Sequence, residues 1–368
     1  MTGPLAPSRP STLRAYVELT KPRIIELLLI TTIPAMVVAA NGWPGLDLVL
    51  VALIGGSLSA GGANVINQVY DSDIDRSMSR TQKRPLPTGR VSLRQATWFG
   101  IALGVGGFVV LAGGANLLAG ILAAAAFIGY VLGYTMVLKR STTQNIVLGG
   151  AAGSVPALIG WAVYTGGLAP EAWFMFAVVF FWTPSHFWAL SLKYQEDYRA
   201  ASVPMLPVVV GIGPTLTNIL WYAVIMAGVA IMLIPVGGLG WIYAATTVTL
   251  CGLSVAFAAR LRRNPNRAMP YFVFTNLVLA GVFLAIMLDR LAATPSLGHS
   301  YAWMTVASTI VGIGVVGVVS VESGKGMRAP GISVLRHGIE VGATVAFVGV
   351  MVLVGWQSVV AICVGPCP

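Results

Sequence analysis

Long apolar stretches alternate with short polar segments along almost the whole chain. A helix needs about 20 apolar residues to cross a lipid bilayer, and most of these stretches have that length. Gly113, Gly114 and Asn116 mark the expected turn inside the nearly continuous apolar region 101–133. The pattern predicts eleven membrane-spanning helices, at residues 24–41, 46–68, 95–113, 117–137, 145–165, 172–192, 215–235, 239–259, 270–289, 302–320 and 338–362.

The composition supports this all-α polytopic membrane fold. Of the 368 residues, 57% are hydrophobic and only 9% are charged. Soluble domains carry roughly 25% charged residues, so a water-facing surface for a chain of this size cannot be built here. The composition therefore excludes a soluble enzyme, a disordered protein and a coiled coil.

The positive residues are sorted to one side of the predicted membrane. The formal net charge is +10, and 21 of the 22 Lys and Arg residues fall on the same side as the N-terminus. Only Arg290 falls on the other side. Because basic loops stay in the cytoplasm, we expect the N-terminal segment 1–23 to be cytoplasmic and the C-terminus to lie outside. The charge is thus explained by topology, with a further role in gripping an anionic substrate left open, and nucleic acid is not an expected partner.

The three cysteines show no spacing typical of a zinc site. Cys251 lies in an apolar stretch, where a cysteine usually packs as a small hydrophobic residue. Cys363 and Cys367 would face an oxidising space at the C-terminus and are candidates to form a disulfide.

A polar cluster marks the end of the second predicted helix. Asn67, Asp71 and Asp75 are spaced four residues apart, which places them on one helical face. Two carboxylates on one face repel each other, so a positive group must offset them. Mg²⁺ prefers oxygen ligands and is usually held by one or two carboxylates together with substrate phosphates. The spacing therefore predicts a Mg²⁺ site, whereas Asp73 points to the opposite face and is expected to be structural.

Basic residues follow this cluster and permit a second interpretation. Arg80 and Arg84 lie in the next loop, and Lys139 and Arg140 follow the fourth predicted helix. Arg and Lys beside paired carboxylates are typical of a site for a metal-chelated phosphate ester. The alternative is a solvated acidic cap paired with Arg76 and Arg80, with the basic residues serving topology alone.

A second polar loop follows the sixth predicted helix. Lys193 and Asp197 are four residues apart, and His186 lies one or two turns deeper on the same face. Asp197 is a candidate ligand for a second metal ion, or it forms a surface ion pair with Lys193, which would contribute little to stability. From the residues alone, His186 is first a hydrogen-bonded core residue, with haem ligation and proton transfer as alternatives.

Five segments together resemble the UbiA superfamily of intramembrane prenyltransferases, and more closely its haem O synthase branch. The resemblance covers roughly residues 12–292. The segments are TKPRIIELLL at 20–29, NQVYDSDIDR at 67–76, RPLPTGR at 84–90, YTMVLKRSTTQNIVLGGAAGSVPALIGW at 134–161 and HFWALSLKYQEDYRAASVPMLPVV at 186–209.

The resemblance implies a bundle of nine helices, within a domain spanning residues 24–292, around a cavity that opens to the bilayer. It implies that Mg²⁺ bridges a prenyl diphosphate to Asn67, Asp71 and Asp75, with Asp197 on the facing loop. The superfamily usually has a second Asp four residues after this one, but Ala201 stands here, which puts a second metal in doubt. The residues that would steady the diphosphate are Arg80, Arg84, Lys139, Arg140 and Lys193.

The implied reaction is farnesyl transfer from farnesyl diphosphate to a vinyl group of haem b, which gives haem O. His186 belongs to a His-Phe-Trp element of this branch and becomes a haem-site candidate. The expected location is the bacterial cytoplasmic membrane, with the active site on the cytoplasmic side and haem A synthase or oxidase assembly factors as candidate partners. An aromatic or quinone-precursor acceptor is the nearest alternative, and a transporter or a haem-binding assembly factor is the alternative from another class.

The chain continues beyond the pattern of this superfamily. Residues 293–368 form an extension with two predicted membrane helices. Gly312, Gly314 and Gly317 in the first of them predict close helix packing.

Overall fold

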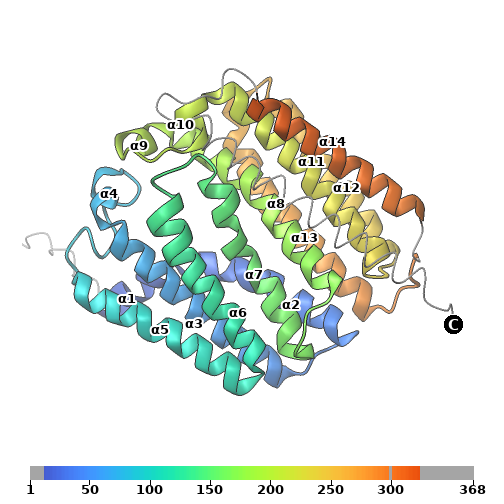
Figure 1. Ribbon diagram of the computed structural model, residues 1–368, viewed down its shortest axis with the longest axis horizontal. Helices are drawn as coiled ribbons and strands as arrows, with labels where there is room; N and C mark the ends of the chain where they lie inside the picture. The colour runs from blue at the N-terminus through green and yellow to red at the C-terminus, as the bar shows by residue number, and fades with distance from the viewer. Residues whose placement is uncertain (1–11, 298–300, 324–368) are drawn as a thin grey trace, which may run out of the picture.

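The computed structural model describes residues 12–297 and 301–323, and these residues are almost entirely helical (Figure 1). The helix α6 (Leu117–Ile128) continues without a break into a π-helix at Gly129–Leu138. The long helices are α2 (Pro22–Ala40), α3 (Leu46–Tyr70), α5 (Leu93–Gly114), α6 (Leu117–Ile128), α7 (Asn145–Thr165), α8 (Pro170–Lys193), α11 (Ile212–Val236), α12 (Trp241–Leu261), α13 (Ala268–Leu291) and α14 (Tyr301–Ser323). The short helices are α1 (Thr12–Thr20), α4 (Ser72–Ser77), α9 (Gln195–Ala200) and α10 (Leu206–Val210), with a 3₁₀ turn at Pro265–Arg267.

The first ten predicted spans are confirmed as helices, with boundaries that differ by about three residues at most. Within the described residues, eight helices are long and apolar enough to cross a membrane, and two shorter apolar stretches lie at Ile30–Ala40 and Trp303–Val318. The eleventh predicted span, 338–362, lies outside the described residues, as do Cys363 and Cys367. The short helices α1, α4, α9 and α10 were not predicted, because each is far too short to show as an apolar stretch.

Local sequence signals explain where several helices begin and end. The predicted turn at 113–116 is present, and the Asn116 side chain accepts a hydrogen bond from the Ala119 amide (3.0 Å), which caps α6. Ser92 and Gln95 form a reciprocal capping box at the start of α5. Pro22 and Pro170 stand at the first helical position, where a missing amide hydrogen costs nothing.

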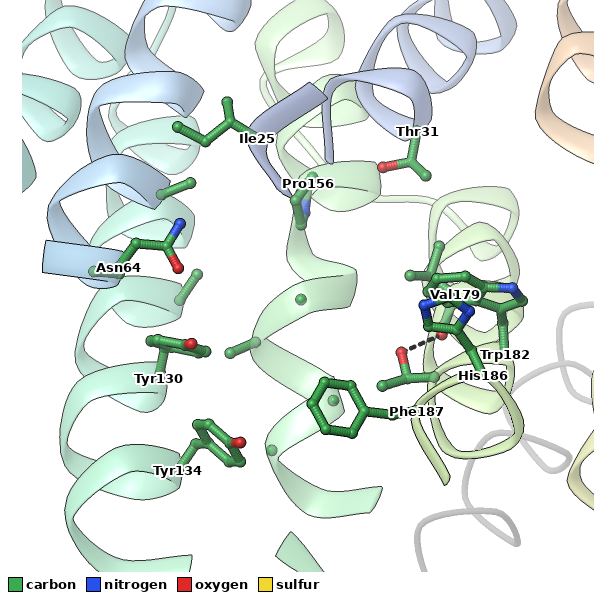
Figure 2. A pocket seen from close by; sticks show the side chains of 18 of the residues that line it. Ile25, Thr31, Asn64, Tyr130, Tyr134, Pro156, Val179, Trp182, His186 and Phe187 are labelled. Carbon is green, nitrogen blue, oxygen red and sulfur yellow. Dashed lines mark hydrogen bonds between the residues drawn. The ribbon is translucent and has the colours of Figure 1, made fainter. Parts of the chain in front are cut away.

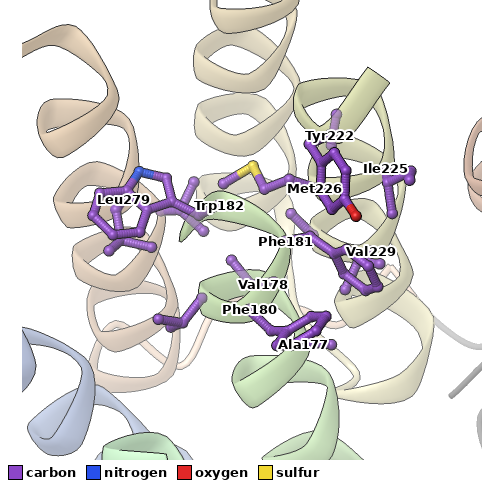
Figure 3. Close-up of a cluster of buried hydrophobic side chains, with 14 of the residues drawn as sticks. Ala177, Val178, Phe180, Phe181, Trp182, Tyr222, Ile225, Met226, Val229 and Leu279 are labelled. Atoms are coloured by element: carbon purple, nitrogen blue, oxygen red, sulfur yellow. The ribbon is translucent and has the colours of Figure 1, made fainter. Parts of the chain in front are cut away.

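Six elements surround a central space: α2, α3, the α6 helix with its π-helical continuation, α7, α8 and α13. Beside them, α8 packs tightly against α11 through large buried side chains. Figure 3 shows Phe181 from α8 near Tyr222, Met226 and Val229 from α11. This apolar packing holds α8 in place and so fixes the wall that it contributes to the central space.

The first helix of the extension, α14, packs along α11 on the outside of the bundle. A Cβ on Gly314 would lie 2.4 Å from Cγ1 of Ile225, and one on Gly317 would lie 2.1 Å from Cδ2 of Trp221. The close packing predicted from these glycines is therefore present, and its partner is α11 of the same chain. A Cβ on Gly312 would meet nothing within 4 Å.

The outer surface of the bundle is apolar. Large hydrophobic side chains point outward from the middle of the long helices, among them Val105, Ile121, Leu253 and Leu277. A protein surrounded by water does not leave so much apolar surface exposed, whereas a lipid-facing helix must. The chain is a multi-pass membrane protein.

The polar connections gather at one end of the bundle. In Figure 1 the short helices α4, α9 and α10 lie together beyond the same ends of the long helices. Arg290 lies at the opposite end, where its guanidinium contacts Asn41 (3.4 Å) and the Gly237 carbonyl. This sorting agrees with the charge asymmetry in the sequence, and which end faces the cytoplasm stays a prediction.

Candidate active site

The predicted acidic face is kept although the helix breaks within it. The helix α3 ends at Tyr70 and α4 begins at Ser72, with Asp71 at the junction. Two helix-type hydrogen bonds cross the junction, from the Asp71 amide to the Asn67 carbonyl (2.9 Å) and from the Asp75 amide to the Asp71 carbonyl (2.8 Å). They keep the four-residue register, so the polar groups stay on one side.

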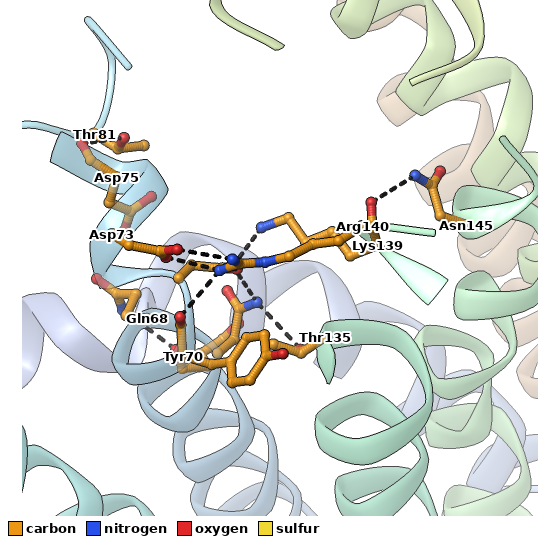
Figure 4. A network of polar contacts seen from close by, with 12 residues as sticks. Gln68, Tyr70, Asp73, Asp75, Thr81, Thr135, Lys139, Arg140 and Asn145 are labelled. Atoms are coloured by element: carbon orange, nitrogen blue, oxygen red, sulfur yellow. Dashed lines mark hydrogen bonds and ion pairs between the residues drawn. The ribbon is translucent and has the colours of Figure 1, made fainter. Parts of the chain in front are cut away.

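Asp71 is the centre of a buried polar network, and its carboxylate is about 1% exposed. Figure 4 shows Lys139 and Arg140 reaching toward the segment that holds Tyr70 and Asp73. The Asn67 side-chain amide donates to its Oδ2 (2.8 Å) and also contacts the Thr135 hydroxyl (3.2 Å). The Lys139 ammonium pairs with the same carboxylate oxygen. Side chains separated by almost seventy residues therefore meet at one carboxylate.

Arg140 links both sides of the acidic segment. Its guanidinium binds Asp73 (2.7 Å) and lies 3.5 Å from Asp71 Oδ1. It also donates to the Tyr70 carbonyl (3.1 Å) and lies 4.8 Å above the Tyr70 ring. The hydrogen bond from Arg140 holds the pKa of Asp73 at about 2. Asp73 therefore orients Arg140 toward the buried carboxylate.

Asp75 is also buried and has a separate partner. One guanidinium nitrogen of Arg84, Nη1, donates to both of its oxygens, at 2.7 and 3.0 Å. Among the described residues, the cations paired with these carboxylates are Arg84, Lys139 and Arg140, and not Arg76 or Arg80 as in the alternative interpretation.

Lys21 lies beside the same network. From the sequence it was expected only to help set the orientation of the chain in the membrane. It stands at the junction of α1 and α2 with a left-handed backbone (φ 54°), which is uncommon for a side chain other than glycine. Its ammonium donates to Asn67 Oδ1 (3.1 Å). Burial, and then the nearby Arg84 and Lys139, lower the pKa of Lys21 to about 7.

The second predicted acidic position lies at the edge of the site. Asp197 is partly exposed on α9 and accepts two contacts from the Ser79 hydroxyl, at 2.9 and 3.2 Å. Its contact with the loop that follows α4 is therefore made by an uncharged group and not by a cation. The helix α8 ends at Lys193, which is exposed, and no ion pair joins it to Asp197 among the residues that the structure describes. Arg80 lies nearby, over the Tyr194 ring at 5.2 Å.

The π-helix at 129–138 connects the polar network to the central space. Wider helical turns of this type often occur at functional sites. This one directs Thr135 toward Asn67 and leads into Lys139, while the Tyr130 and Tyr134 rings lie 5.3 Å apart, centroid to centroid, on the cavity wall. A Cβ on Gly149 would lie 2.3 Å from the Tyr134 ring, so a glycine is required there for the ring to lie across α7.

The central cavity has a volume of about 480 Å³ and mostly apolar walls. Figure 2 shows Tyr130 and Tyr134 facing Trp182, His186 and Phe187 across it. Arg23, Arg80 and Asn64 line it as polar residues. Such a space, with few polar groups beside a charged network, is typical of a site for a largely apolar ligand with an anionic end.

His186 is buried in the cavity wall between two aromatic rings. The Trp182 ring lies 4.1 Å away and the Phe272 ring 4.2 Å away, both nearly parallel to the imidazole. The His186 Nδ1 lies 2.7 Å from the Thr275 hydroxyl on α13. The histidine is therefore both a hydrogen-bonded core residue, as the sequence alone favoured, and a residue that lines the cavity.

The donor groups at the polar end fit a hard divalent cation that shares its coordination with phosphate. The described residues contain no group of three His, Cys, Asp or Glu side chains close enough to enclose a metal. They do supply an amide oxygen and carboxylate oxygens, from Asn67, Asp71 and Asp75. Mg²⁺ is usually bound in this incomplete way, with substrate phosphates and waters as the remaining ligands.

A family model described as the UbiA prenyltransferase family matches residues 28–280. The chain belongs to this family. A "Protoheme IX farnesyltransferase" of Thermus thermophilus is 50% identical over 282 residues, which are 76% of this chain and 46% of that protein, so the chain spans about half of the length of that relative. A "Protoheme IX farnesyltransferase 1" of Saccharopolyspora erythraea is 50% identical over 299 residues, which are 80% of this chain and 95% of that protein.

Solved UbiA-type structures show the same fold. A digeranylgeranylglyceryl phosphate synthase has a TM-score of 0.64 at 20% identity, covering 76% of this chain and 99% of that chain. A UbiA homologue from Aeropyrum pernix K1 has a TM-score of 0.59 at 21% identity, covering 73% and 98%. A UbiA homologue from Archaeoglobus fulgidus, bound to DMAPP and Mg²⁺, has a TM-score of 0.51 at 16% identity, covering 74% and 98%.

Proposed function

We propose that this UbiA-family chain transfers the farnesyl group of farnesyl diphosphate to a vinyl group of haem b and so forms haem O. The names of its relatives support this reaction over an aromatic or quinone-precursor acceptor. The observation that carries the proposal is a buried, multiply charged network next to a mostly apolar cavity that has a histidine in its wall. The π-helix connects the two, because Thr135 contacts Asn67 while Tyr130 and Tyr134 line the cavity.

The charged end would bind the diphosphate. Asn67, Asp71 and Asp75 would hold Mg²⁺, with Asp197 as a more distant ligand, and bound Mg²⁺ would stabilise the negative charge of the leaving diphosphate. In the structure Lys21, Lys139 and Arg140 contact these ligand side chains. Lys139 and Arg140 neutralise the Asp71 carboxylate in the absence of substrate, whereas Lys21 contacts the neutral Asn67. All three would bind phosphate oxygens when the substrate is present. Arg80, Arg84 and Lys193 would complete the basic rim.

The apolar cavity would control the reactive carbon. The bond between farnesyl C1 and the diphosphate oxygen breaks, and its electron pair leaves with the diphosphate. The vinyl carbon of haem b attacks C1 and forms the new carbon–carbon bond. Water then adds to the cation left on the porphyrin side chain and releases a proton. Tyr130 and Tyr134 lie between the charged end and the cavity, where their ring faces would stabilise an allylic cation.

His186 would bind the acceptor. It lies in the wall facing the two tyrosines, and neutral imidazole is a common ligand for haem iron. Axial binding of the iron would fix the porphyrin relative to farnesyl C1. The membrane would be the bacterial cytoplasmic membrane, with the charged end and the N-terminus on its cytoplasmic side. Haem A synthase or oxidase assembly factors are the proposed protein partners.

The test uses the purified chain in lipid nanodiscs with Mg²⁺, labelled farnesyl diphosphate, and haem b and 4-hydroxybenzoate side by side. Mass spectrometry is expected to find label in hydroxyethylfarnesyl haem and stoichiometric diphosphate. Label in the aromatic acid would instead support the alternative acceptor. Binding without release of diphosphate would support a transporter or a haem-binding assembly factor. The Asp71→Ala variant should insert normally and form no haem O.

A further inference from the structure

We propose that Thr275 is a positioning residue for His186: its hydroxyl holds the imidazole proton on Nδ1 and leaves Nε2 free to bind the haem iron. This inference rests on the proposed function, in which His186 binds the acceptor. The supporting observation is an arrangement of side chains from α8 and α13 that fixes both the plane of the ring and its tautomer.

The ring plane is fixed by stacking on both faces. Trp182 lies four residues before His186 on α8, and its ring is 4.1 Å from the imidazole at an angle of 19°. Phe272 on α13 covers the other face at 4.2 Å and 25°. An imidazole held between two rings cannot turn about its outer side-chain bond without displacing one of them, so the directions of its two nitrogens are set.

The tautomer follows from counting hydrogens. The Thr275 hydroxyl has one hydrogen, and it donates that hydrogen to the Phe272 carbonyl (2.8 Å). The same oxygen lies 2.7 Å from His186 Nδ1. Both contacts are hydrogen bonds at the same time only when the hydroxyl donates to the Phe272 carbonyl and accepts from Nδ1, and this is the tautomer that we infer. In the neutral ring the other nitrogen, Nε2, then carries a free lone pair, which is the form that binds a metal.

The position of Thr275 is fixed in turn by Trp182. The indole nitrogen of Trp182 donates to the Thr275 carbonyl (2.8 Å). Trp182 therefore stacks on His186 and also holds the backbone of Thr275, the residue that is hydrogen-bonded to His186. This closed loop joins α8 to α13 and prevents the threonine from moving away when the iron binds.

A hydroxyl partner also suits a haem that has to leave as product. A carboxylate on the far nitrogen would raise the basicity of the imidazole and strengthen its bond to iron. A neutral hydroxyl orients the ring with less of this effect. Thr275 therefore gives a defined axial bond of moderate strength, which a substrate requires and a permanent cofactor does not.

The test compares His186→Ala, Thr275→Val and Thr275→Ser, each as the full chain in nanodiscs. Thr275→Val keeps the shape of the side chain and removes the hydroxyl, while Thr275→Ser keeps the hydroxyl. Thr215→Val is the matched control, because Thr215 is a buried threonine on α11 that bonds to the Gly211 carbonyl (2.7 Å) and does not line the cavity. The probe is haem b, and the readouts are its Kd and the iron–histidine stretching band of the ferrous complex.

We expect the iron–histidine band in the wild type, in Thr275→Ser and in Thr215→Val, and its loss in His186→Ala. Thr275→Val should shift the band to lower frequency and raise the haem Kd by about tenfold, the lower end of the usual effect of losing such a partner. If Thr275→Val does not insert, Thr275→Ala removes the same hydroxyl and gives the same test.

An unchanged band and Kd in the Thr275 variants without the hydroxyl would overturn the inference. A band that persists in His186→Ala would overturn it as well, by showing another axial ligand. Haem O formation by the wild type is measured in the same preparation. If the wild type forms haem O and the Thr275 variants behave like it, only the role of Thr275 is refuted. If the wild type binds haem through His186 and forms no haem O, the proposed reaction is refuted.

Discussion

The two acidic regions of the candidate site, Asp71 with Asp75 and Asp197 on the facing loop, differ in burial and in the charge of their partners. Asp71 and Asp75 are almost fully buried and are paired with Lys139, Arg140 and Arg84. Asp197, on the facing loop, is partly exposed and bonds to a neutral hydroxyl. Burial without a cation would be very costly for a carboxylate, so the first region must carry its own positive charges. The second region is partly exposed to solvent and does not carry this cost.

This difference suggests separate roles for the two regions in binding a metal ion and a diphosphate. A buried carboxylate surrounded by cations is held in place before any ligand arrives, so little reorganisation is needed when metal and phosphate bind. A partly exposed carboxylate on a short helix is held less firmly. We infer that the first region binds the ion and the second region helps to enclose it.

The largest expected effect is that of Asp71→Asn. The substitution keeps the shape of the side chain and removes the charge that Lys139 and Arg140 share. We expect farnesyl transfer to fall by about 10³-fold, at the upper end of what a single electrostatic contact supplies. Initial rates of haem O formation at saturating Mg²⁺ measure this. A loss of less than tenfold would show that Asp71 does not hold the ion.

The next effect separates two lysines that the sequence assigned to the same task. Lys139→Gln removes the cation on the buried carboxylate, and we expect kcat/KM for farnesyl diphosphate to fall by about 10²-fold. Lys193 is exposed at the end of α8, and Lys193→Gln should change it by about threefold or less. Equal losses would contradict the division between a buried and a peripheral region.

Lys21→Gln is expected to have an intermediate effect, because its ammonium contacts the neutral Asn67. We expect KM for farnesyl diphosphate to rise by about tenfold with a smaller change in kcat. Arg14→Gln is a suitable control, since Arg14 is exposed on the neighbouring α1. An unchanged KM would show that Lys21 serves only the turn between α1 and α2.

The smallest effect should be that of Asp197→Asn. Its present partner, the Ser79 hydroxyl, can bond to an amide as well as to a carboxylate. We expect activity to fall by about fivefold or less, with the Mg²⁺ concentration for half-maximal rate raised by a similar factor. Loss comparable to that of Asp71→Asn would mean that Asp197 is a primary ligand and that the enclosing role is wrong.

Much of the site could be predicted because its signals are local. The spacing of Asn67, Asp71 and Asp75 and the basic residues that follow depend only on helical periodicity and charge. The identity of the cations that neutralise each carboxylate could not be predicted, because Lys139 and Arg84 reach the site through the fold. Lys21 was missed for the same reason, since a single lysine before a membrane helix is normally a topology signal.

The sequence by itself determined the membrane-spanning helices, the asymmetric distribution of charge and the acidic face, because each depends on residues within a few turns of one another. The tertiary structure decided that Asp71 meets Lys139, that Asp197 lies at the edge, and that His186 is held between Trp182, Phe272 and Thr275 in the cavity wall. These contacts join distant helices, and they depend on how side chains fill the space between those helices, which periodicity and charge do not specify.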